Sequence, residues 1–118
     1  MGMLSKPDAS WIAQMRKGCA EYCLLAALAG GEAYGYEILQ RLARYEPLTL
    51  GESTVYPLLS RLTREGFLTV QVRDSSSGPP RRYYRWTAEG RERLRGMHDY
   101  WDHLVESMSN IKKEPGHG

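Results

Sequence analysis

The sequence predicts one mainly α-helical domain that carries a small β-hairpin. Two observations indicate this class. Apolar residues recur every three or four positions in four separate segments, which is the period of an amphipathic helix. Between the third and fourth segments the period changes to two, and a run of Ser, Gly and Pro separates two strand-like stretches. The length of 118 residues is that of one domain, and 42% hydrophobic residues are enough to form a core.

The first part of the chain predicts a mobile arm followed by two helices. The arm would cover residues 1–9, and Ser10 would cap a helix that begins near Trp11 and ends at a glycine pair, residues 30–31. The second helix fits residues 34–45, because Pro47 cannot continue it. Its core-facing residues would be Ile38, Leu39, Leu42 and Tyr45.

A third helix and a hairpin follow. The helix would begin at Glu52 or Ser53 and close at Gly66, with Pro57 tolerated at the edge of its first turn. Its apolar stripe would be Val55, Leu58, Leu59 and Leu62. Residues 67–72 and 81–86 then predict two strands, and the turn-forming residues 74–80 predict a flexible tip between them.

Residues 87–112 predict a long last helix, and residues 113–118 a disordered tail. The apolar positions of this helix step by three and four, as in helices that pair. They are Leu94, Met97, Trp101, Leu104, Met108 and Ile111, and Val105 adjoins them. Leaving such a seam in water forfeits ~1.5–3 kcal/mol per large side chain, so a second copy of the chain is expected to cover it.

Three short helices and a hairpin form the element order of a winged helix-turn-helix, here residues 10–86, with residues 87–112 as a C-terminal dimerisation helix. In that fold the third helix enters the major groove of DNA. The face opposite its apolar stripe carries Ser53, Thr54, Tyr56, Pro57, Ser60, Arg61 and Arg64. Hydroxyl groups near a helix start can bind phosphate, and arginine can read guanine. A plain solvated face is the alternative.

Positive charge is concentrated in the same region. The whole chain has a formal charge of +2, whereas residues 53–86 carry six arginines against two acids, a net charge of +4. Arg73, Arg81 and Arg82 flank the predicted tip, where they could follow the sugar-phosphate backbone or enter the minor groove. A surface hairpin that happens to carry arginine is the alternative.

Three segments resemble the PadR-like family of transcriptional regulators, in its short subclass with one C-terminal helix. They are YGYEILQRL (34–42), STVYPLLSRLTREGFL (53–68) and RRYYRWTAEGRERL (81–94), and the resemblance extends over residues 15–111. It implies a homodimeric repressor on an operator of approximate two-fold symmetry. Tyr34 stands where the family often has His, and Trp86 where Leu is usual.

The resemblance also implies roles for individual residues. Tyr36 would touch the DNA backbone, and the third helix would place Ser53, Thr54 and Tyr56 in the major groove. The predicted hairpin is the wing of this fold, and its arginines would hold phosphates. Several short members of the family hold flat aromatic compounds between paired tryptophans at the dimer centre. Trp101 lies at the matching position, so a small ligand that relieves repression is expected there.

Three further residues could line the same cavity. They are Trp11, Met15 and Met97. Aromatic rings sandwich flat compounds and methionine adapts to varied shapes, although plain interface packing would place the same residue types here.

No enzyme is predicted, because the sequence has no nucleophile–base pair, phosphate loop or convergent pair of acids, and no cofactor is expected. Cys19 and Cys23 lie four apart on one helix, which favours buried free thiols and a cytoplasmic location. The longest apolar run is too short to cross a membrane, and no signal peptide is evident.

Two His/Asp pairs lie four residues apart in the last helix. The pairs His98/Asp102 and Asp99/His103 have a spacing that could bind Zn²⁺ or Ni²⁺, although a solvated helix face is the favoured explanation. The alternatives to a ligand-relieved repressor are therefore a metal-responsive regulator of the same fold and a winged-helix module that binds another protein.

Overall fold

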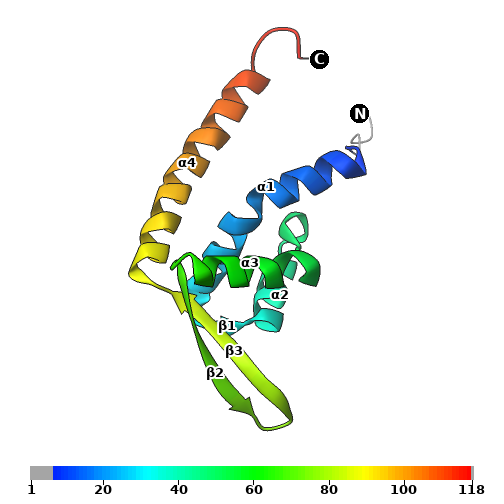
Figure 1. Ribbon diagram of the computed structural model, residues 1–118. Coiled ribbons are helices and arrows are strands. Elements are labelled where there is room, and N and C mark those ends of the chain that lie inside the picture. The colour runs from blue at the N-terminus through cyan, green and yellow to red at the C-terminus, as the bar shows by residue number, and fades with distance from the viewer. Residues whose placement is uncertain (1–6, 118) are drawn as a thin grey trace.

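The computed structural model describes residues 7–117, which form four α-helices and a three-stranded antiparallel sheet. The helices lie at one end of the sheet, and the hairpin projects away from them (Figure 1). The elements are α1 (Ala9–Ala27), η1 (Leu28–Gly30), β1 (Ala33–Tyr34), α2 (Gly35–Ala43), η2 (Glu46–Leu48), α3 (Glu52–Arg64), β2 (Leu68–Ser75), β3 (Gly78–Trp86) and α4 (Ala88–Lys112). This is the winged helix-turn-helix with one long C-terminal helix that the sequence predicts.

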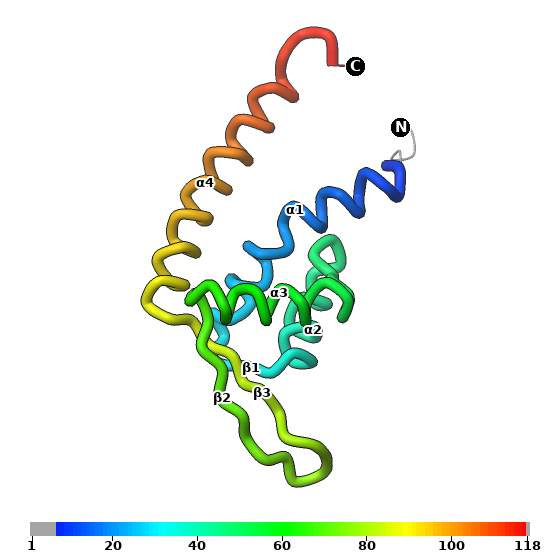
Figure 2. Tube along the Cα trace, in the orientation of Figure 1, coloured from blue at the N-terminus to red at the C-terminus, as the bar shows by residue number. Residues whose placement is uncertain are grey.

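The trace in Figure 2 shows how the long helices leave the domain. The start of α1 and the end of α4 point in the same general direction, whereas the β2–β3 hairpin projects to the opposite side. None of the helices in residues 7–117 is long and apolar enough to cross a membrane.

The start of α1 differs from the prediction at its cap. Asp8 is the N-cap, and its carboxylate accepts a hydrogen bond from the Ser10 amide at 2.7 Å. Ser10 lies inside the first turn, because an Asp two residues earlier reaches the free amides instead. Residues 1–6 of the predicted arm lie outside the described residues, as does Gly118 of the predicted tail.

The sheet contains a strand that the sequence pattern misses. β1 pairs with β3 through Ala33 opposite Tyr84 and Tyr34 opposite Tyr83, giving the strand order β1-β3-β2. Two residues cannot show an alternating pattern, which is why the periodicity places Tyr34 in the helix that in fact begins at Gly35.

The hairpin is longer than predicted. The strands continue to Ser75 and resume at Gly78, so the expected turn over residues 74–80 is wrong at most of its positions. Val70 and Val72 are 37% and 59% exposed, since this part of the hairpin extends beyond the core. Backbone pairing lets the strands continue through residues with no apolar alternation.

The core lies between α1, α2, α3 and the base of the sheet. Ile38, Leu59, Leu62 and Leu68 are fully buried there, as the periodicity predicts. Tyr45 is an error of the prediction, because α2 ends at Ala43 and leaves that ring 61% exposed.

The start of α4 is fixed firmly to the domain. Thr87 caps the helix by accepting a hydrogen bond from the Gly90 amide, and its hydroxyl donates to the Gly66 carbonyl at 2.6 Å. The Thr87 amide donates to the Phe67 carbonyl at 3.1 Å. Trp86 donates from Nε1 to the carbonyl of Leu25 at 2.8 Å, which ties the end of β3 to α1. The base of α4 is therefore held against the α3–β2 turn.

Candidate nucleic-acid interface and the adjoining groove

The outer face of α3 is set by its buried stripe. Because Val55, Leu59 and Leu62 point into the core and Leu58 packs against it, the polar residues between them lie toward the outer face. Ser53, Tyr56, Ser60 and Arg64 are exposed, whereas Thr54 and Arg61 are half-buried. The N-cap of α3 is Gly51, which has no side chain to satisfy the first-turn amides. These amides and the neighbouring hydroxyls are chemically suited to an anion.

Tyr56 links α3 to the start of α2. Its ring lies over Gly35, so closely that a Cβ at position 35 would overlap Cε1 of the ring. Tyr36, the next residue of α2, is 54% exposed, and Tyr56 is 44% exposed. Both tyrosine rings are thus accessible from outside.

Arg61 is engaged within the chain. Its Nη2 donates to Glu21 Oε1 of α1 at 2.7 Å, and its Nη1 donates to Glu65 Oε1 at 2.8 Å. The second oxygen of Glu21 accepts a hydrogen bond from Arg93 Nε of α4. Burial alone would raise the pKa of the Glu21 carboxyl, but the bonds from Arg93 and Arg61 outweigh it and hold that pKa below its usual value. Arg64, by contrast, is exposed and forms no ion pair within residues 7–117.

The arginines of the hairpin divide between its two faces. The strand register places Arg73 and Arg81 opposite each other on one face, together with Tyr83. Arg81 lies over the ring of Tyr34 at 4.5 Å from its centroid, and the rings of Tyr34 and Tyr83 meet edge to face at 5.4 Å. Arg82 points from the other face.

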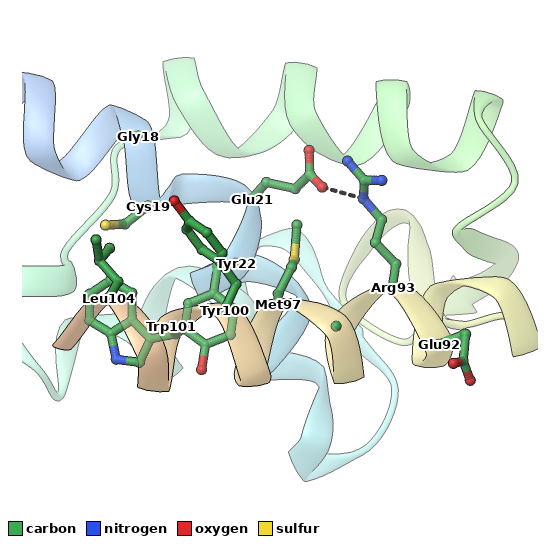
Figure 3. A pocket seen from close by; sticks show the side chains of 11 residues that line it. Gly18, Cys19, Glu21, Tyr22, Glu92, Arg93, Met97, Tyr100, Trp101 and Leu104 are labelled. Carbon is green, nitrogen blue, oxygen red and sulfur yellow. Dashed lines mark hydrogen bonds and ion pairs between the residues drawn. The ribbon is translucent and has the colours of Figure 1, made fainter. Parts of the chain in front are cut away.

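A groove of about 640 Å³ lies between α1 and α4 (Figure 3). Trp101 of α4 stacks on Tyr22 of α1 with ring centroids 5.7 Å apart and planes 29° apart. The Tyr22 hydroxyl shares a hydrogen bond of 2.7 Å with His98 Nδ1. Met97 and Cys19 also line the groove, and its far end reaches the Glu21–Arg93 pair that is dashed in Figure 3.

The other residues predicted for a ligand lie beside the same tryptophan. Met15 and Trp101 both line a neighbouring hollow along α4, and Trp11, Met15 and Trp101 line another towards η2. Each of the other three predicted residues thus lines a hollow that Trp101 also lines. Tyr22 of α1 also lines the groove, and no motif in the sequence singles it out.

The seam predicted on α4 is open over its outer part. Val105, Met108 and Ile111 are 46%, 52% and 61% exposed, and Trp11 and Met15 of α1 are also exposed. Leu104 and Trp101 are half-buried.

Leu94 is the exception among the seam residues. It is 4% exposed and packs in the core of its own chain, because the base of α4 lies on the domain. The seam therefore begins later than the heptad spacing indicates.

Two smaller predictions concern cysteine and metal chemistry. Cys23 is buried and Cys19 half-buried, and both are free thiols. Between residues 7 and 117 no three His, Cys, Asp or Glu side chains gather as a metal site. His98 shares a hydrogen bond with Tyr22.

Comparison with known proteins gives a consistent result. The family model described as "Transcriptional regulator PadR-like family" matches residues 24–96. The structure is similar to that of a PadR-like transcription factor from Bacteroides fragilis, with 37% identity, a TM-score of 0.71, and coverage of 86% of this chain and 98% of the other. A PadR family transcriptional regulator from Eggerthella lenta gives 30% identity, a TM-score of 0.79, and coverage of 89% and 91%. An uncharacterized protein of Lysinibacillus sphaericus is 27% identical over 99 residues, which are 82% of this chain and 84% of that protein.

Proposed function

This chain belongs to the PadR-like family of transcriptional regulators, whose members act by binding DNA, and on that premise we propose that it is a homodimeric repressor relieved by a small aromatic ligand. The repressor acts in the cytoplasm on a double-stranded operator of approximate two-fold symmetry. We propose no catalytic activity, cofactor or membrane partner for it.

One observation carries the proposed contact with DNA: the outer face of α3 combines an uncapped helix start with exposed hydroxyl and guanidinium groups. Ser53, Thr54 and Tyr56 meet base edges and phosphates in the major groove, with Arg64 beside them. Further residues in the proposed interface are Tyr36, Arg61, Arg81 and Arg82, and Arg73 lies near them on the hairpin with its side chain paired to Glu32. Arg61, held by two carboxylates, contributes mainly by positioning α3.

The proposed dimer rests on the exposed apolar row of α4. Val105, Met108 and Ile111 are all exposed, by 46% to 61%. Trp11 and Met15 extend this apolar surface onto α1. A second copy that covers it, with Leu104 and Trp101 at its edge, removes the row from water. Two-fold pairing then sets two α3 helices about 34 Å apart, one turn of DNA.

The proposed ligand is a flat aromatic compound that lies beside Trp101, with Met15, Trp11 and Met97 around it. Such a compound relieves repression only if it binds more tightly to a dimer geometry in which the two α3 helices no longer match the operator. The groove lies between α1 and α4, whose relative angle determines that geometry.

Salt-dependent DNA binding tests the proposal. The probes are a random-sequence duplex and a duplex selected by the wild-type protein from a randomised pool. Affinity should fall steeply with salt, and the selected duplex should bind more tightly than the random one. Arg64→Gln should reduce the slope of log affinity against log salt by about 0.9 for each phosphate that the variant no longer neutralises.

The matched control is Arg95→Gln, which removes the same charge from an exposed ion pair with Glu92 on α4. It should leave the slope unchanged. Absence of salt-dependent binding by the wild-type protein would overturn the DNA-binding role and favour a winged helix that binds protein.

A further inference from the structure

The Arg73 side chain is directed back along the hairpin rather than outward. Arg73 lies in the distal part of β2, opposite Arg81, whereas Glu32 immediately precedes β1 at the base of the sheet. Nevertheless Arg73 Nη1 contacts Glu32 Oε1 at 2.5 Å. The side chain reaches this carboxylate by crossing the ring of Tyr83, with its guanidinium carbon 4.7 Å from the ring centroid.

A third contact completes the environment of this guanidinium. Its Nη2 donates to Gln71 Oε1 at 2.8 Å. A carboxylate, an amide and an aromatic face thus occupy one arginine at once. An exposed ion pair alone is weak, but both partners here are only about one-third exposed, with 39% for the Arg73 side chain and 34% for Glu32. The cation–π contact with Tyr83 adds to the pair.

The hairpin needs such a support. The third strand, β1, pairs with β3 only at positions 33 and 34, so the part of the hairpin beyond Tyr83 is two-stranded. A two-stranded ribbon is marginally stable on its own. Arg82, one residue along β3, offers a contrast, because it is exposed and forms no ion pair in the described part of the chain.

We propose that Glu32 holds Arg73 as an internal strut, which fixes the wing against the base of the sheet and withholds this arginine from DNA phosphates. Glu32 is thereby a positioning residue that affects specificity. By pairing with Arg73, it keeps one positive charge of the hairpin from binding phosphate and so lowers the sequence-independent part of the DNA affinity. Arg82 remains free to bind phosphate. The inference rests on the proposed DNA-binding function.

Four variants test this assignment of the wing charges with a short random-sequence duplex: Glu32→Gln, Arg73→Gln, the double variant, and Arg82→Gln. Glu114→Gln is the matched control, since it removes one exposed acid beyond the end of α4. Glu32→Gln should free Arg73 and steepen the salt slope by about 0.9 per bound protomer. Raising salt from 50 to 200 mM should then cost this variant about 3.5-fold more affinity per protomer than it costs wild type.

The remaining variants separate the strut from a direct phosphate contact. Arg73→Gln should leave the slope of wild type unchanged, Arg82→Gln should reduce it by about 0.9, and the double variant should return the slope of Glu32→Gln to that of wild type. A reduced slope for Arg73→Gln alone would overturn the proposal, because Arg73 would then bind phosphate in wild type. An equal rise in Glu32→Gln and Glu114→Gln would also overturn it, because net charge alone would explain the effect.

Trypsin cleavage after Arg81 and Arg82 reports the mechanical role without DNA. Removal of the strut should speed this cleavage in both Glu32→Gln and Arg73→Gln but not in Glu114→Gln, while the thermal unfolding of the domain confirms that each variant is folded. Unchanged cleavage in both variants would overturn the strut. If wild type binds no duplex, the proposed function fails, and the cleavage rates still decide whether the strut exists.

Discussion

Replacing Gly90 with alanine should destabilise the protein, although alanine is the better helix former. Gly90 lies in the first turn of α4, and a Cβ there would overlap the Phe67 carbonyl oxygen and lie 2.9 Å from its carbonyl carbon. That oxygen cannot simply move, because it accepts the Thr87 amide at 3.1 Å. Relief requires α4 to lift from the α3–β2 turn and to weaken the cap that Thr87 forms.

The magnitude follows from two opposing effects. Alanine gains about 1 kcal/mol over glycine in a helix interior. Overpacking against a fixed group costs about 1–3 kcal/mol, and disturbing the hydrogen bond of Thr87 adds about 1 kcal/mol. Gly90→Ala should therefore lower the free energy of unfolding by about 1–3 kcal/mol, a fall of several degrees in Tm at roughly 4 °C per kcal/mol.

Gly96→Ala is the matched control in the same helix. A Cβ at Gly96 meets no atom within 4 Å, so only the helix-propensity gain of about 1 kcal/mol remains and Tm should rise. Thermal unfolding followed by circular dichroism, with all proteins at one concentration, measures both shifts. If Gly90→Ala raised Tm as Gly96→Ala does, the close seating of α4 on Phe67 would be wrong.

Three further predictions concern the pKa of Glu21, the groove and the dimer. Folding favours the ionised carboxylate of Glu21, so Glu21→Gln should lower the free energy of unfolding by about 1 kcal/mol at neutral pH. The difference between the two proteins, measured by urea unfolding, should shrink as the pH falls below 4.5 and the carboxyl of wild type becomes protonated. A difference that stays constant with pH would contradict the lowered pKa. Ethidium, added without DNA, should quench tryptophan fluorescence strongly in wild type and much less in Trp101→Ala. If a compound quenches Trp101 but leaves the affinity of the protein for the selected duplex unchanged, ligand relief is contradicted. Met108→Glu should shift the sedimentation of the protein from dimer to monomer, because it buries a charge in the proposed interface. Asn110→Glu, on the opposite side of α4, should leave the dimer intact. Equal behaviour of the two variants would show that α4 does not form the interface.

The periodic parts of the fold could be predicted from sequence, because burial on one face imposes a regular spacing. α3 shows this best: its stripe at Val55, Leu59 and Leu62 is fully buried, and the polar face follows from it. β1 could not be found in this way, since two residues carry no period. The length of the hairpin escapes prediction for a related reason, because strands outside the core are held by backbone pairing and need no apolar alternation.

The environment of each candidate site residue was less predictable than its position. Arg61 and Arg64 look alike in the sequence, yet only Arg61 finds Glu21, which lies 40 positions earlier. Such long-range pairing leaves no local pattern. Leu94 continues the spacing of the α4 seam, but the base of α4 rests on the domain and buries it there. Spacing identifies an apolar residue without saying which surface covers it.

The contact between Gly35 and Tyr56 has a consequence for attempts to re-engineer the DNA preference of this chain. A side chain at position 35 would meet the far end of a tyrosine ring, not rigid backbone, so it would displace Tyr56 rather than prevent folding. Position 35 thus alters the outer face of α3 without lying on it. A library that randomises position 56 should therefore randomise position 35 as well, because a smaller residue at one position makes room for a larger residue at the other.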